Sequence, residues 1–489
     1  MLSTEDWWAV WLGLALYAAS LASLFGVDLV GWMPRPRVWE WTDITGGFAW
    51  SKLLAAVGAG YASWHPLVAW LAAYAVFTVL LAVGARCQGL SVARFVAGFT
   101  VLFVLTWIAW LAGNELHLTI VDATVDGRNR YREGGLSWGL QLGEGAPYLL
   151  ALFVGLAIGN FAKGFAARLA EAAKPEWFIK TAIVFLGVNL GAQTVQASGF
   201  AGQLILTGAA ATFVAYMFFW PIVYTLARRV FKLKRDASAV LASGISICGV
   251  SAAIATGGAI RARPVIPVTV SMLVVIFAML ELLVLPGAYT AFFPDQPVVN
   301  GAALGMTVKT DGADAAAGAL LDGLLVSAHL AQSGEQWQAG WILSASLLTK
   351  IWIDVFIGVW AFVLAIIWVY KVEKRAGAVS ISPAEIWFRF PKFVLGYFVA
   401  WLSYLAIAAW AGAGATLATG TSVVQGPMRT MLFMLTFVAM GTVTDFSKLK
   451  GMGRLAVLYA VALLVVIVPI AYGVAYLFHR GLLPPLVSQ

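Results

Sequence analysis

The chain has 489 residues, of which 61% are hydrophobic and 11% charged, and its mean hydropathy is +0.87. Soluble domains carry about 25% charged residues, so this composition excludes a soluble globular protein and assigns most of the chain to lipid. The net charge of +8 is expected to lie in cytoplasmic loops, where Lys and Arg concentrate in membrane proteins. We therefore expect the lipid bilayer, and no nucleic acid, as a partner.

Apolar stretches of roughly 20 residues, the length of a spanning helix, recur along the whole sequence. The shorter alternating segments typical of a membrane β-barrel are absent from it. We predict an all-α polytopic membrane protein with about thirteen transmembrane helices. They are expected at residues 7–25, 66–84, 93–112, 146–162, 177–196, 203–227, 237–260, 265–290, 301–330, 340–369, 391–411, 427–446 and 455–478.

The first three spans form a region of their own, residues 1–145. They are rich in Trp, which prefers the membrane–water boundary. The first span follows Glu5 and Asp6 rather than a basic segment, so we expect a retained helix and not a cleaved signal peptide. These three helices are predicted to be a peripheral or oligomerisation module, with a homodimer as one outcome, ahead of a functional core.

Charge predicts the orientation of the chain in a bacterial inner membrane. With the N-terminus in the cytoplasm, the inside loops carry most Lys and Arg residues, as the positive-inside rule requires. Arg261 and Arg263 are the exception, because they fall outside; a re-entrant segment before them would explain it. The inside residues are Arg86, Arg94, Lys163, Arg168, Lys174, Lys180, the cluster Arg228–Arg235, Lys371, Lys374, Arg375, Lys448, Lys450 and Arg454.

The segment Ser243–Gly258 is built from Gly, Ser, Ala and Thr instead of large apolar residues. Irregular backbone at membrane depth is tolerated only where it is buried in protein or lines a cavity, and interrupted helices of this kind hold solutes in secondary transporters. Tight helix packing through small residues is the alternative. We predict a broken helix at a substrate site with contributions from Ser246, Cys248, Gly249 and Ser251.

Charged residues are predicted inside three later spans. Such charges are costly in lipid unless they are paired or face water. Asp311, Asp314 and Asp322 share a polar face next to Lys309, and Lys350 lies four residues before Asp354. We expect Asp311, Asp314, Asp354 and the isolated Glu281 to couple an ion or a proton; a self-neutralising structural group is the alternative.

The core after residue 146 is predicted to contain an inverted repeat of five plus five helices, with halves at 146–290 and 291–489. Gly249–Ser251 aligns with Gly441–Val443, since each pairs a glycine with a hydroxyl residue. Corresponding interrupted helices in two halves indicate a binding site. Thr307, Gly441 and Thr442 therefore join Lys309 and Lys350 as predicted substrate-binding residues.

Ser246–Thr256 resembles the signature of the bacterial sulfate exporter family, and Lys174–Gln196 and Ala439–Leu449 resemble its other conserved helices. The resemblance covers roughly residues 146–480. It implies export of sulfate or a related sulfur oxyanion, and a fold similar to cation–proton antiporters and bile-acid symporters, with two crossed interrupted helices. The chain departs from the family pattern where Thr307-Val308-Lys309-Thr310 replaces Thr-Val-His-Glu, and Lys350 stands where the family has Arg.

These observations favour a secondary transporter that exports a small anion, such as sulfate or a sulfonate, by alternating access. The alternative is a cation–proton antiporter that uses Na⁺ and H⁺. The sequence contains no phosphate-binding GxxxxGKS or GxxxxGKT loop, no HExxH motif and no Cys/His cluster. We accordingly expect neither an enzyme nor a protein with a cofactor or metal site.

Overall fold

The computed structural model describes residues 4–40, 61, 64–120, 131, 135, 137–140, 142, 145–263, 265–368, 391–411, 414–447 and 453–487. In these residues the chain forms helices and two isolated β-bridges, and no sheet. Of the predicted inside charges, Lys371, Lys374, Arg375, Lys448 and Lys450 lie outside the described residues. The all-α polytopic fold is confirmed.

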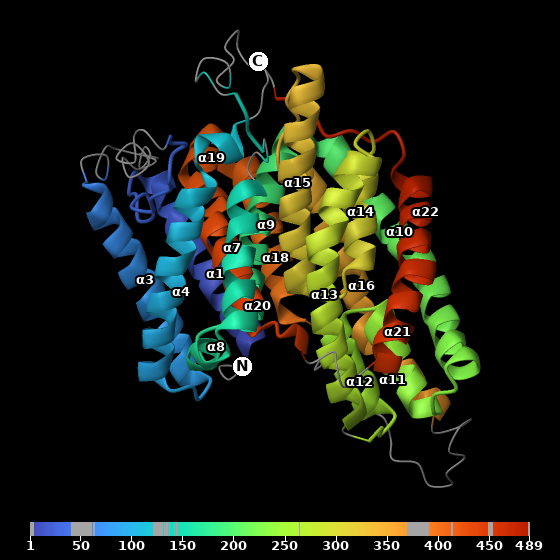
Figure 1. Ribbon diagram of the computed structural model, residues 1–489. Coiled ribbons are helices and arrows are strands. Elements are labelled where there is room, and N and C mark those ends of the chain that lie inside the picture. The colour runs from blue at the N-terminus through green and yellow to red at the C-terminus, as the bar shows by residue number, and fades with distance from the viewer. Residues whose placement is uncertain are drawn as a thin grey trace.

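The helices follow the predicted spans closely along the chain (Figure 1). The first half contains α1 (Glu5–Leu21), η1 (Ala22–Phe25), α3 (Pro66–Cys87), α4 (Val92–Gly113), α5 (Leu116–Thr119), α7 (Ala146–Phe161), α8 (Lys163–Leu169), α9 (Pro175–Gln196), α10 (Ser198–Thr225), η3 (Leu226–Val230), α11 (Arg235–Ser246) and α12 (Gly249–Ala259). The second half contains α13 (Val265–Phe292), α14 (Pro297–Thr307), α15 (Asp311–Ser333), α16 (Trp341–Ile367), α18 (Lys392–Ala411), α19 (Gly414–Val423), η5 (Val424–Met428), α20 (Arg429–Val443), α21 (Gly453–Val461), η7 (Ala462–Ile467) and α22 (Val468–His479).

Eleven described helices are long and apolar enough to cross a membrane, or up to twelve if α7 and α8, which meet at 114°, count as one bent span. Figure 1 shows the two chain ends on opposite sides of the bundle. The count of thirteen spans stays a prediction. Two of the predicted spans, 237–260 and 301–330, are not single helices, because each consists of two antiparallel helices.

The first of these, hairpin 1, consists of α11 and α12. The chain reverses at Ile247 and Cys248, so both outer ends lie on the same side of the bundle (Figure 1). There the Nε atom of Arg263 lies 4.0 Å from Oδ2 of Asp236. Arg261 and Arg263 are therefore on the same side as the Arg228–Arg235 cluster, and the re-entrant segment expected from their charge is present.

The second, hairpin 2, consists of α14 and α15 and enters from the opposite side. Gly301 and Gly305 let α14 approach the carbonyl oxygens of Ile342 and Ser346, so α14 runs parallel to α16. Asp314 of α15 bonds Ser346, whereas the later residue Asp322 bonds the start of α16, so α15 runs antiparallel to α16. The chain therefore reverses between Thr307 and Asp311.

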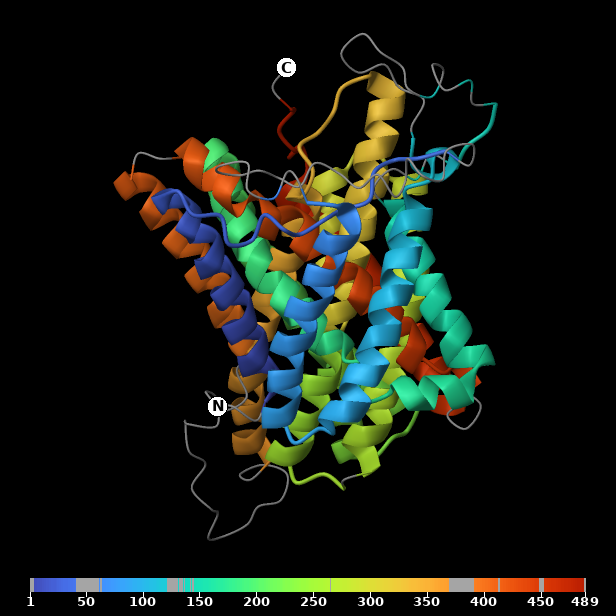
Figure 2. The same ribbon diagram turned by 90° about the vertical axis from the view of Figure 1, so that its left-hand side faces the viewer.

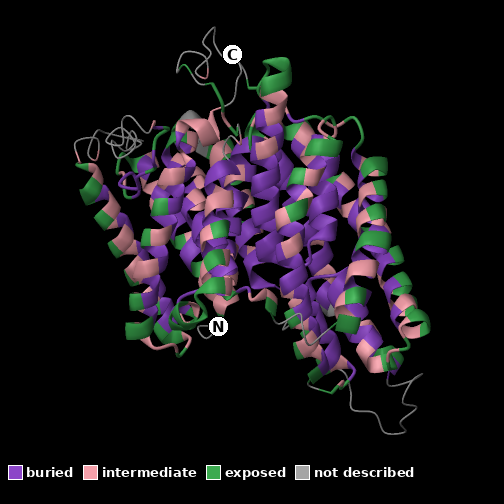
Figure 3. Ribbon diagram, viewed as in Figure 1, coloured by how far each residue is buried: buried purple, intermediate pink, exposed green. Residues whose placement is uncertain are grey.

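The core of the bundle is formed by the hairpins and the helices that contact them. Figure 3 shows buried residues concentrated in the central helices and exposed residues on the outer faces and the far end of α15. Helices α9, α15 and α20 are the most buried of the candidate spans, whereas the α3 window is 28% buried. This distribution places the hairpin tips away from lipid.

Helix α1 packs against helices that follow residue 146, and the assignment of residues 1–145 to a peripheral or oligomerisation module stays a prediction. Figure 2 shows α1 alongside α18, and α1 also packs on α9, where Gly13 contacts Val184. The Nζ atom of Lys180 donates to Oδ1 of Asp6 at 2.8 Å. The first helix is thus part of the core, whereas the predicted boundaries after residues 145 and 290 stay predictions.

Candidate functional site

The tips of the two hairpins meet inside the bundle. Gly249 has φ of +28°, a backbone conformation that side chains other than glycine rarely adopt, and a Cβ atom at this position would lie 2.7 Å from the Lys309 carbonyl oxygen. The Sγ atom of Cys248 donates to Oδ1 of Asp311 at 3.1 Å. The contact between the hairpin tips therefore includes the Gly249 backbone and a thiol–carboxylate pair.

An ion-pair chain continues from this contact into α16. The Nζ atom of Lys350 lies 3.3 Å from Oδ1 of Asp311 and 3.1 Å from Oδ1 of Asp354, and all three side chains are at most 5% exposed. Buried charges are tolerated when they are paired, and removal of one partner is strongly destabilising. Lys350 thus ties hairpin 2 to α16 electrostatically.

The same atoms have a spacing compatible with cation binding. Ligand atoms of Cys248, Asp311 and Asp354 lie within 4.8 Å of one another. A thiol and two carboxylates are a donor set that transition metals accept. The ammonium group of Lys350, however, already contacts both carboxylates, so the protein supplies its own cation at this position.

A cavity of about 330 Å³ reaches these tips from the side of the molecule where the N-terminus lies. The side-chain exposure falls from 40% at Glu176 to 13% at Lys180 and 5% at Asp311, so Glu176 marks the mouth and Asp311 the floor. The lining residues are Glu5, Pro175, Glu176, Lys180, Cys248, Val250, Ser251, Val275, Ala278, Met279, Thr310, Asp311, Ala313, Met440 and Val443.

Two helix N-termini line this cavity. Helix α12 begins at Gly249 and contributes Val250 and Ser251, and α15 begins at Asp311 after its N-cap Thr310. The first N–H groups of a helix have no partner within the helix, and each N-terminus carries a partial positive charge. The Thr310 hydroxyl already accepts from the Ala313 N–H group, so the two tips offer a solute the other first amide groups of α12 and α15.

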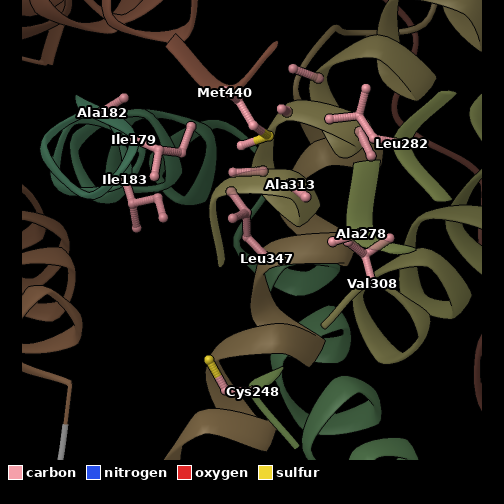
Figure 4. Packing of buried hydrophobic residues seen from close by; sticks show 14 of the residues in the cluster. Ile179, Ala182, Ile183, Cys248, Ala278, Leu282, Val308, Ala313, Leu347 and Met440 are labelled. Carbon is pink, nitrogen blue, oxygen red and sulfur yellow. The ribbon is translucent and has the colours of Figure 1, made fainter. Parts of the chain in front are cut away.

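Apolar side chains pack around the second tip. Figure 4 shows Ile179 of α9, Met440 of α20 and Ala313 of α15 close together, with Ala278 and Leu282 of α13 on the other side. All five are at most 1% exposed except Met440 at 5%. The polar groups at the cavity floor consequently lie in a surround of low polarity, which strengthens their electrostatic interactions.

The structure brings together only part of the predicted site. Of the predicted residues, Cys248, Ser251 and Asp311 line the cavity, and Lys350 and Asp354 lie directly behind Asp311. Buried residues that do not line it are Ser246, Thr307, Lys309, Asp314 and Glu281, and Gly249 faces the Lys309 backbone instead.

Lys309, the predicted anion ligand, points away from the cavity. Its Nζ atom donates to the Met306 carbonyl oxygen and lies 4.9 Å from the centroid of the Phe219 ring. Asp322, grouped with Asp311 in the sequence, accepts instead from the backbone N–H groups of Gly340, Ile342 and Leu343. The sequence therefore identified Lys309 and Asp322 as charged residues within a span. It did not show that their side chains contact different parts of the bundle.

The predicted pairing of Gly249 with Gly441 is wrong. Residues Arg429–Val443 form one uninterrupted helix, α20, and Gly441 packs on Gly155 of α7. The Thr442 hydroxyl donates to the Val438 carbonyl oxygen within the same helix. The partner of the first break is the break between α14 and α15, separated from it in sequence by α13 alone, and the five-plus-five repeat stays a prediction.

Sequence reasoning missed the mouth of the cavity. In the sequence, Glu5 stands only as a residue before the first predicted span, Lys180 is predicted only as an inside charge, and Glu176 has no predicted role. The Nζ atom of Lys180 lies 2.8 Å from Asp6 and 3.6 Å from Glu176. A usable signal was present in the i, i+4 spacing of Glu176 and Lys180 at the start of a predicted span, which indicates a charged helix face.

Comparisons with known proteins assign the chain to a family. Residues 140–460 match the family described as conserved hypothetical protein 698. A UPF0324 membrane protein of Nitrosomonas europaea is 58% identical over 100% of this chain and 98% of its own length. UPF0324 membrane proteins of Rhodopirellula baltica and Nitratidesulfovibrio vulgaris are 30% and 29% identical over 80% and 78% of this chain, and 64% and 59% of their own lengths. The chain belongs to the UPF0324 family of membrane proteins.

Proposed function

We propose that this membrane protein is a secondary active transporter that binds a small anion between the tips of its two hairpins. The observation that carries this proposal is the convergence of the α12 and α15 N-termini on one cavity. Half-helix N-termini are the elements with which broken-helix transporters hold anionic groups, and free amide groups bind sulfate and phosphate at helix ends generally.

The substrate class follows from size and from the resemblance of Ser246–Thr256 to sulfate exporters. A cavity of about 330 Å³ accommodates sulfate, sulfite or a small sulfonate. Outward movement of an anion is favoured by an inside-negative membrane potential, by about 2.3 kcal/mol per charge and 100 mV. The same potential would thus drive export from the cytoplasm.

The orientation required for export agrees with the charge distribution. Arg86, Arg94, Lys163 and Lys174 border the side on which the N-terminus lies, and hairpin 1 adds Arg261 and Arg263 to that side. By the positive-inside rule this side faces the cytoplasm, and the cavity opens toward it. We infer an inward-facing state of a bacterial inner-membrane protein.

Asp311 is the residue that would couple the anion to a proton. Its carboxylate lies at the cavity floor and holds Lys350 at 3.3 Å. Protonation of Asp311 would remove the negative charge that opposes an anion and leave the Lys350 ammonium with less compensation. Anion and proton would then favour each other's binding by the same factor, as linkage requires.

Cation–proton antiport is the second candidate, favoured by the charge of the cavity wall. Among the described lining residues are three carboxylates, those of Glu5, Glu176 and Asp311, against the single ammonium of Lys180. Such a wall attracts Na⁺ and repels a free anion. In this mechanism Asp311 and Asp354 would exchange Na⁺ for protons.

Flux through proteoliposomes under an imposed membrane potential separates the two candidates. We expect labelled sulfate or sulfite efflux that rises as the pH falls, and Asp311→Asn should retain efflux but lose its pH dependence. Asp295→Asn, an exposed carboxylate in the turn before α14, is the matched control and should behave as the parent. Proton movement driven by Na⁺ that is lost in Asp311→Asn, without oxyanion flux, would establish antiport instead.

A further inference from the structure

A second candidate binding site lies outside the cavity at the hairpin tips. It lies at the C-terminal end of α10, on the side of the molecule where the N-terminus of the chain lies. Here α10 continues through η3, and a short turn leads into α11, so that basic residues from both helices converge. They border a hollow of about 420 Å³ lined by Tyr224, Thr225, Arg228, Arg229 and Arg235. Three guanidinium groups thus face one hollow, and no carboxylate is among its described lining residues.

The nearest acidic side chain is already engaged. Asp236 follows Arg235 directly, but its Oδ1 atom accepts from the Ala237 N–H group at 2.9 Å and its Oδ2 atom lies 4.0 Å from Nε of Arg263. The turn itself is fixed by two arginines, since Arg228 donates to the Leu233 carbonyl oxygen and Arg454 to that of Phe231. The backbone turn that carries the arginines of the hollow is therefore fixed by hydrogen bonds.

An apolar groove adjoins the hollow. It has a volume of about 460 Å³, is lined by Pro221, Ile222, Thr225, Leu226, Arg229 and Val230, and shares Thr225 and Arg229 with the arginine hollow. Ile222 is 39% exposed and Val230 64%. Figure 1 shows this end of α10 at the edge of the bundle, beside α11.

We propose that the hollow and the groove together bind one anionic phospholipid. Its phosphodiester would lie among Arg228, Arg229 and Arg235, since guanidinium groups bind phosphate oxygens in pairs. The glycerol backbone and the first part of an acyl chain would lie along Ile222 and Val230. Basic pockets next to apolar helix faces on the cytoplasmic side recognise acidic headgroups in this way.

The groove selects a lipid over a soluble anion. Inorganic phosphate could contact the arginines but would leave the exposed Ile222 and Val230 without a partner, whereas a lipid covers both. The site lies at the base of hairpin 1, because Arg235 is the first residue of α11. A lipid bound there would restrain the hairpin from its cytoplasmic end, independently of which solute the protein carries.

Native mass spectrometry of the detergent-purified protein, titrated with phosphatidylglycerol or phosphatidylcholine, tests the proposal. We expect a phosphatidylglycerol adduct on the parent and a much weaker phosphatidylcholine adduct. At about five-fold per basic residue near the surface, Arg229→Gln/Arg235→Gln should weaken phosphatidylglycerol binding roughly 30-fold. Arg229→Lys/Arg235→Lys should retain much of it.

Two controls separate this result from general charge effects. Arg168→Gln removes an exposed arginine of α8 on the same side of the protein and should leave lipid binding unchanged. Val230→Asp should weaken the lipid adduct while the three arginines remain. Equal binding of both lipids, equal loss in Arg168→Gln, unchanged binding in the double variant, or an equal thermal stabilisation by inorganic phosphate would overturn the proposal.

If the double glutamine variant does not purify as a folded protein, Val230→Asp and the lysine pair decide the question. Loss in Val230→Asp with retention in the lysine pair supports a lipid. Retention in Val230→Asp would contradict it.

Discussion

The two hairpins differ in how they are held, although their tips meet inside the bundle. Hairpin 1 is rich in small residues, and the ends of its two helices are joined by Arg263 and Asp236, whose side chains are 62% and 25% exposed. Hairpin 2 is joined to α16 by the Lys350–Asp311 ion pair, the Asp314–Ser346 bond and the Asp322 cap, all buried. Exposed ion pairs contribute at most about 1 kcal/mol, whereas buried ones are costly to break.

This difference indicates a division of labour between the hairpins. Hairpin 2 presents charge in a fixed position. Hairpin 1 presents an N-terminus on a segment that, besides the exposed Arg263–Asp236 pair, is held by the Cys248–Asp311 and Trp220–Ser243 hydrogen bonds. Segments with few buried polar contacts open at low free-energy cost. We therefore expect hairpin 1 to move during alternating access while hairpin 2 stays with α16.

The largest expected effect comes from Lys350→Met. This change leaves Asp311 and Asp354 buried without their cation, which should lower the free energy of unfolding by about 3–5 kcal/mol. Thermal unfolding in detergent measures it. Adding Asp354→Asn to Lys350→Met should recover part of the loss, because one uncompensated charge is removed; a double variant as unstable as the single one would contradict the assigned pairing.

Asp322→Ala is expected to be next in size. The carboxylate accepts from three backbone N–H groups, at 2.8 Å from Gly340, 3.0 Å from Ile342 and 3.3 Å from Leu343. Their loss at a buried helix start should cost about 2–3 kcal/mol. Asp322→Asn keeps one acceptor oxygen and should lose less, and equal losses in the two variants would show that the cap is not what fixes α15 to α16.

Most of the residues that distinguish the two hairpins could be predicted from the sequence, but the reversal of the chain within each hairpin could not. The small residues of Ser243–Gly258 and the charges at Lys309, Asp311 and Lys350 were recognised because each is unusual in lipid. A helix that continues through Ile247–Cys248 or Val308–Thr310 and a helix that reverses there can have the same residue pattern, because neither segment contains proline. The sequence therefore did not show that the chain reverses. The ion pair of Lys180 with Asp6 depends on α1, which is distant from Lys180 in sequence.

A matched pair of glycines tests the packing of the two hairpins. A Cβ atom on Gly305 would clash with the backbone carbonyl oxygen of Ser346, whereas one on Gly244 would meet the end of the Val270 side chain at 2.9 Å. Gly305→Ala should cost about 1–3 kcal/mol by overpacking, and Gly244→Ala less, since a side chain can rotate away. Gly287→Ala, with no atom within 4 Å of its Cβ position, is the control.

The smallest effect on stability, and the sharpest test of mobility, is expected from Asp236→Ala. Loss of the exposed pair with Arg263 should change the unfolding free energy by no more than about 1 kcal/mol.

Cys248 is 3% exposed at the tip of hairpin 1, and Cys87→Ser leaves it as the single thiol of the chain. In that background, Asp236→Ala should speed alkylation of Cys248, because the two ends of hairpin 1 separate more often. Gln338→Ala, in the turn between α15 and α16, should leave the rate unchanged. Equal acceleration by both changes would mean that hairpin 1 does not open by itself, and the proposed division of labour would be wrong.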